Sequence, residues 1–110
     1  MIRVEPKLVF HWKEDYLMSS GKMITIEMKL VKFPEVQKGE YPEDYKFNWI
    51  AFEQDNPEER VLFDNHHGKD PHFHINDQEE FFTWISQEKT QKLFFKKVRE
   101  KFGEFLIKMK

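Results

Sequence analysis

The chain of 110 residues carries 18 basic and 20 acidic side chains, five histidines and no cysteine. This length suits one domain over residues 1–110, and the lack of cysteine excludes a disulfide framework or a thiol-based site. The sequence has neither a signal-peptide pattern nor an apolar run long enough to cross a membrane, so we expect a cytoplasmic protein without a membrane partner.

Alternating apolar and polar residues in the first three quarters of the chain predict an antiparallel meander of about five or six strands. The pattern is clearest over 23–33, where every second side chain is apolar, and the turn over 19–22 before it indicates a hairpin. The predicted strands are 8–12 with a continuation over 16–18, then 23–33, 45–53, 60–64 and 72–75, with 81–85 as a last strand or a bridge. A polar loop is expected over 34–44.

The period changes to that of a helix after Ser86, which is a suitable N-cap. One side of this helix is apolar and consists of Leu93, Phe94, Val98, Phe102, Phe105, Leu106 and Met109. Gly103 is expected to weaken or end the helix. A run of strands followed by one amphipathic helix predicts an α+β fold, with the C-terminal helix packed on one face of the sheet.

Positive charge is concentrated in residues 87–110, which hold 8 basic and 3 acidic side chains, whereas residues 1–86 have a net charge of −7. This segment either binds phosphate or an acidic partner, or is the solvated face of a helix whose C-terminal end favours positive charge. The sequence leaves both interpretations open.

Residues 64–74 contain four of the five histidines together with one lysine and two aspartates. Histidine can exchange a proton near neutral pH, so this segment is the candidate functional site. Gly68 and Pro71 are expected to bend the chain between the two histidine pairs, which would then face each other across a turn. The nearby pairs Glu58–Glu59 and Glu79–Glu80 are interpreted as solvated carboxylates.

The segment 62–75, Leu-Phe-Asp-Asn-His-His-Gly-Lys-Asp-Pro-His-Phe-His-Ile, combines Asp-Asn-His, Gly-Lys and a His-x-His pair. In this pattern the chain resembles the TumE-type toxin family of toxin–antitoxin modules. The resemblance implies a toxin with a cognate antitoxin as partner, and RNA is then a natural substrate. A homodimer is left open.

Four interpretations of this segment compete. In the first, His66, Lys69, His72 and His74 catalyse RNA cleavage by acid–base chemistry without a metal, and Asp64 and His67 orient the substrate. In the second, which is not the favoured one, a divalent ion such as zinc is held by Asp64, His66, His72 and His74. The third is binding of nucleic acid or a partner without catalysis, and the fourth is a structural role in a hairpin.

Overall fold

The computed structural model describes residues 6–33, 45–66 and 69–109, and for residues 66, 69 and 70 it describes the backbone alone. The elements are β1 (Lys7–Met18), β2 (Met23–Lys32), β3 (Tyr45–Glu53), β4 (Arg60–His66), β5 (Lys69–Ile75), β6 (Gln78–Phe81), α1 (Gln87–Phe102) and β7 (Phe105–Met109). The expected loop over 34–44 lies outside the described residues.

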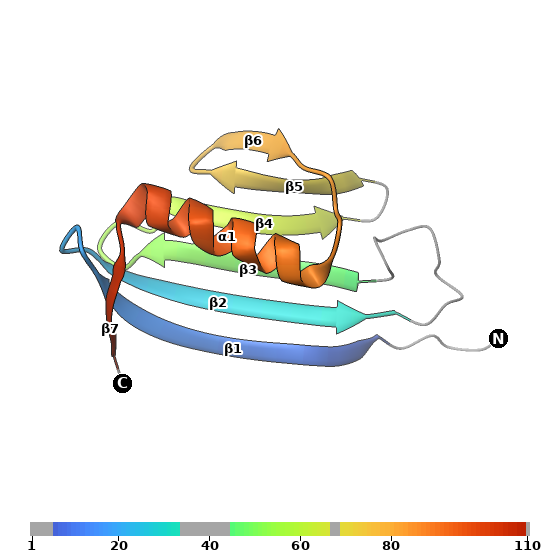
Figure 1. The fold of residues 1–110 in the computed structure, drawn as a ribbon, viewed down its shortest axis with the longest axis horizontal. Coiled ribbons are helices and arrows are strands. Elements are labelled where there is room, and N and C mark those ends of the chain that lie inside the picture. The colour runs from blue at the N-terminus through green and yellow to red at the C-terminus, as the bar shows by residue number, and fades with distance from the viewer. Residues whose placement is uncertain (1–5, 34–44, 67–68, 110) are drawn as a thin grey trace.

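Seven strands form one antiparallel sheet in the order β6-β5-β4-β3-β2-β1-β7, as Figure 1 shows. Strands β1 to β6 follow one another in space as they do along the chain, and this confirms the predicted meander. Only β7 breaks the sequential order, because the chain crosses the sheet as α1 before it pairs with β1. The α+β fold is confirmed, and the strand count is slightly higher than expected.

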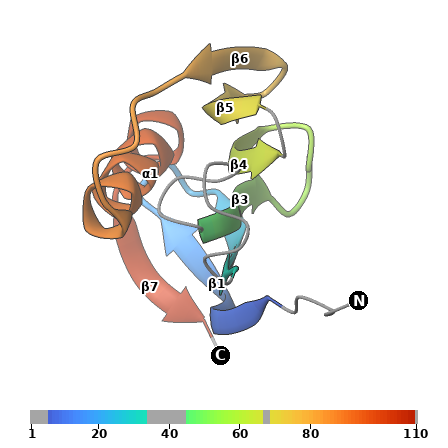
Figure 2. The same ribbon diagram turned by 90° about the vertical axis from the view of Figure 1, so that its right-hand side faces the viewer.

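Helix α1 covers one face of the sheet, which Figure 2 shows with the strands seen nearly end-on. Side chains alternate between the two faces of a strand, so every second residue points toward α1. Among the described residues, no helix covers the opposite face. That opposite face, which carries His11, Lys29, Asn48, Asp64 and His72, is called the open face below.

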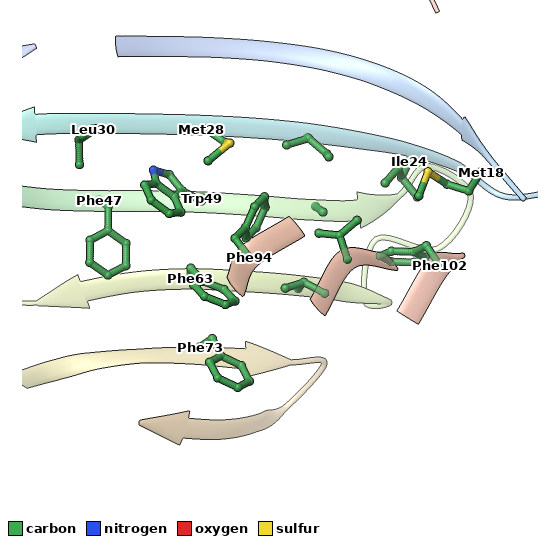
Figure 3. Packing of buried hydrophobic residues seen from close by; sticks show 14 residues of the cluster. Met18, Ile24, Met28, Leu30, Phe47, Trp49, Phe63, Phe73, Phe94 and Phe102 are labelled. Carbon is green, nitrogen blue, oxygen red and sulfur yellow. The ribbon is translucent and has the colours of Figure 1, made fainter. Parts of the chain in front are cut away.

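The hydrophobic core lies between α1 and the sheet (Figure 3). Phe94 of α1 meets the rings of Trp49 and Phe63 edge-on, with centroids 5.9 and 5.3 Å away. Each large side chain that is fully buried stabilises the fold by about 1.5–3 kcal/mol through the hydrophobic effect. The buried apolar residues are Met18, Ile24, Ile26, Met28, Leu30, Phe47, Trp49, Ala51, Val61, Phe63, Phe73, Phe94, Val98 and Phe102.

Helix α1 begins after the N-cap Ser86 that the sequence predicts, and it ends at Gly103, where the sequence predicts either a weakened helix or its end. The Ser86 side chain accepts a hydrogen bond from the backbone N–H of Lys89 at 3.1 Å, so it caps the first turn. At the other end Gly103 has a φ of +89°, a conformation that glycine adopts without strain. The Ser20 hydroxyl donates to the Phe102 carbonyl at 2.6 Å, and Ser19 Oγ accepts from the backbone N–H of Glu104 at 2.7 Å. The β1–β2 turn therefore supplies hydrogen-bond partners for backbone groups at the C-terminal end of the helix.

Residues beyond Gly103 form β7 rather than more helix, so the prediction that Phe105, Leu106 and Met109 continue the apolar side of the helix is wrong. The turn at Gly103 directs the chain to the edge of β1, where backbone pairing replaces helical hydrogen bonds. Lys108 of β7 contacts Glu14 of β1 at 2.8 Å. The hydrogen bond from Lys108 and a second one from Tyr16 hold the pKa of Glu14 below its ordinary value.

The predicted last strand over 81–85 is displaced, because β6 spans Gln78–Phe81. The hairpin of β4 and β5 also contains an irregularity. Asp64 pairs with His72 and His66 pairs with Lys69, so β5 has one residue more than β4 between these pairs. Pro71 lies in this bulge, where a missing N–H is tolerated. The expectation that Pro71 belongs to the turn between the histidine pairs is therefore wrong.

Within the described ranges, the structure contains no helix with both the length and the apolar composition needed to cross a membrane.

Candidate metal centre

The candidate site lies on the open face, over strands β4, β5 and β6. His72 and His74 are two residues apart on β5, so their side chains share a face. Asp64 of β4 is the cross-strand neighbour of His72, and Glu79 of β6 is the cross-strand neighbour of His74. Each histidine therefore has one carboxylate beside it, contributed by a different neighbouring strand.

The His72 ring is buried against Asp64. Nε2 of His72 lies 2.8 Å from Oδ1 of Asp64, and the two side chains are 1% and 9% exposed. The ring also lies near His74 and Phe81, with centroid distances of 5.2 and 5.8 Å. A buried carboxylate beside an imidazole fixes the orientation and tautomer of the ring.

His74 and Glu79 form the more accessible half of the site. Nε2 of His74 lies 3.6 Å from Oε2 of Glu79, and the two side chains are 23% and 30% exposed. One ligand atom from each of His72, His74 and Glu79 can be chosen so that all three lie within 4.8 Å of one another. Two imidazoles and one carboxylate are a donor set that suits zinc and other divalent transition metals.

These three side chains could hold a metal ion with an open coordination position. Catalytic zinc sites usually have three protein ligands, and the remaining position takes water or substrate. Histidine ligands of metals almost always have a carboxylate, carbonyl or water on their second nitrogen, and Asp64 stands beside His72 in the corresponding way. Nε2 of His74 and Oε2 of Glu79 are also close enough to interact directly with each other.

The structure brings together only part of the set that the sequence suggests. Asp64, His72 and His74 are neighbours. His66 and Lys69 are paired at the end of the β4–β5 hairpin, but their side chains are outside the described residues, as is all of His67. The acid–base set and the proposed ligand His66 therefore stay predictions.

Sequence reasoning missed Glu79, which was interpreted as a solvated carboxylate. Its place beside His74 depends on the register of β5 and β6. The signal for that register is the short turn at Asn76 and Asp77, where Asn76 has a φ of +55°. Counting back from this turn puts Ile75 opposite Gln78 and therefore places Glu79 next to His74.

Asn65 is a residue type common in turns, but in the structure its side chain connects two strands. The side chain is fully buried, with Oδ1 accepting from the backbone N–H of Phe47 and Nδ2 donating to the carbonyl of Tyr45, both at 3.0 Å. These bonds join β4 to β3 just beyond the Asn48–Asp64 pair, where the regular backbone pairing of the two strands ends. Asn65 thus holds the end of β4 in place next to Asp64.

Comparison of the chain with protein-family models, curated proteins and solved structures finds no significant match in any of the three. The resemblance to TumE-type toxins therefore stays a prediction that depends on residues 62–75.

Proposed function

We propose that the protein is a metal-dependent hydrolase in which His72, His74 and Glu79 bind a divalent ion of the zinc type. The observation that supports this proposal is the mutual distance of their ligand atoms, all within 4.8 Å. A zinc ion held by these three side chains would supply a water nucleophile that is activated near neutral pH. Asp64 would orient His72, because it already lies 2.8 Å from that ring.

The test is a calorimetric titration of zinc into protein that has been purified without nickel and treated with a chelator. We expect one zinc ion per chain, and we expect His74→Ala and Glu79→Gln each to weaken binding by at least about tenfold. Glu80→Gln is the matched control, because Glu80 is also exposed on β6 but pairs with Phe73 on the other face of the sheet. If zinc does not bind, or if both ligand variants bind it as wild type does, the proposal is wrong.

The pattern in residues 62–75 supports a second proposal, that the protein is a cytoplasmic toxin that cleaves RNA and is neutralised by an antitoxin. The neighbouring Asp64 and His72 favour proton transfer, because a carboxylate can orient an imidazole that acts as a general base. In this version no metal is needed.

Growth after tightly controlled expression tests the second proposal. Wild type should arrest growth, whereas a His72→Ala/His74→Ala variant with equal soluble expression should not. If neither or both arrest growth, the toxin proposal with this histidine pair fails. RNA cleavage that persists in EDTA would support the acid–base version over the metal-dependent one.

A further inference from the structure

A second feature of the open face is a hollow of about 510 Å³ over β1, β2 and β3. The residues that line it include Lys29, Lys46 and Asn48. Apolar surface is supplied by Val31 and Phe33. The hollow therefore combines positive charge with an aromatic ring, as sites for single-stranded nucleic acid do.

The charge balance of the hollow favours an anion. Within the part of the chain that the structure describes, neither Lys29 nor Lys46 has a carboxylate in ion-pair contact. Glu27 is the acidic residue in the wall, and its Oε2 lies 2.8 Å from Nε2 of His11. Lys29 and Lys46 can therefore bind a negatively charged ligand.

The hollow and the candidate metal centre are connected by one cross-strand row. Lys29 pairs with Asn48, Asn48 pairs with Asp64, and Asp64 pairs with His72. Because paired residues on neighbouring strands point to the same face, this row runs across the open face. Three strand spacings separate Lys29 from His72, which corresponds to roughly 14 Å.

From this row we infer that the open face binds a single-stranded phosphodiester chain, with phosphates on Lys29 and Lys46 and a distal linkage beside His74, in the accessible half of the candidate metal centre. The inference rests on the proposed function, since it names the substrate class of that same site. A phosphate monoester is too short to contact both ends of the row, whereas a polynucleotide strand carries regularly spaced charges. Val31 and Phe33 provide apolar surface for one base.

The experiment is fluorescence anisotropy with a labelled oligouridine in EDTA, so that RNA binding is measured without a metal. We expect the Lys29→Gln/Lys46→Gln variant to bind at least about tenfold more weakly than wild type. Its plot of log affinity against log salt should be shallower by about 1.4, since each contact with a single-stranded phosphate contributes about 0.7. Lys89→Gln/Lys96→Gln is the control, because both lysines are exposed on α1.

The inference is overturned if the Lys29/Lys46 variant binds oligouridine as wild type does, or if the α1 control loses as much affinity. It is also overturned if polyglutamate competes as well as unlabelled oligouridine does, because the face would then recognise carboxylates. Circular dichroism checks that both double variants are folded. Zinc titration of the Lys29/Lys46 variant should match wild type, so failure of the metal site and failure of the lysine site give different results.

Discussion

Asp64 and His72 face each other across β4 and β5, with Oδ1 and Nε2 2.8 Å apart and both side chains withdrawn from solvent. The adjacent pair of His74 and Glu79, on the same face of the sheet, is more exposed. A carboxylate in this place acts on a bound ion through the histidine that it orients. The contact therefore belongs to the buried half of the site, and His72 is the residue that it shares with the possible ligand set of His72, His74 and Glu79.

Replacing this carboxylate tests its positioning role. Asp64→Asn keeps the shape of the side chain but removes its charge, and we expect zinc affinity to fall by about 10–100-fold. The measurement is calorimetric titration, with Asp77→Asn as the control, because Asp77 is fully exposed in the β5–β6 turn. Unchanged zinc affinity in Asp64→Asn would contradict the proposal that Asp64 orients His72. Zinc titration of His72→Gln would then show whether the His72 ring is a ligand at all.

Loss of the Asn65 amide should destabilise the sheet beside the site. Asn65→Ala leaves the Phe47 N–H and the Tyr45 carbonyl without the side-chain partners that they have in the native sheet. We expect the free energy of unfolding to fall by about 1–3 kcal/mol for each buried group left unpaired. Urea denaturation measures this change, and Asn48→Ala is the control because Asn48 is exposed on the adjacent strand. Equal stability of the two variants would show that the bridge is not needed.

Gly103 should be intolerant of any side chain. Its φ is +89°, and an added Cβ would lie 2.3 Å from Ser19 Oγ and 3.2 Å from the backbone nitrogen of Ser20. Gly21 offers a matched control, since it has a φ of +86° and no atom near the corresponding Cβ position. Backbone strain of this kind costs about 1–3 kcal/mol, so thermal unfolding should show both alanine variants destabilised, Gly103→Ala more than Gly21→Ala. The reverse order would contradict the close contact of α1 with the β1–β2 turn.

Tyr16 should titrate at high pH. Burial raises the pKa of Tyr16 to about 12, and the hydrogen bond that its hydroxyl donates to Glu14 adds to this effect. Because the folded pKa lies above the unfolded value of 10.0, the stabilisation is complete below pH 10 and is lost as pH rises through about 12. Tyrosinate absorbance of wild type minus Tyr16→Phe should show a midpoint near pH 12. A midpoint near pH 10 would mean that burial and the hydrogen bond to Glu14 do not raise the pKa of Tyr16.

The sequence predicted most of the helices and strands, because the residue patterns that indicate them involve only residues close together in the chain. The alternation of Ile24, Ile26, Met28 and Leu30 placed β2 in the core, since side chains of a strand alternate between faces wherever the strand lies. The bounds 45–53 predicted for β3 agree with the structure for the same reason. Phe105 shows where periodicity misleads, because its apolar side chain suits a helix face as well as the edge strand that it forms.

The sequence alone was sufficient to predict the meander, the helix start after Ser86, a weak point of the helix at Gly103 and the presence of His72 and His74 on one face. Those features depend on dihedral preferences and on spacing within a single element. The bulge at Pro71, the pairing of β7 with β1 and the place of Glu79 beside His74 depend on register between strands. Register is set by packing over the whole sheet, because a shift of one residue moves every side chain of a strand to the other face.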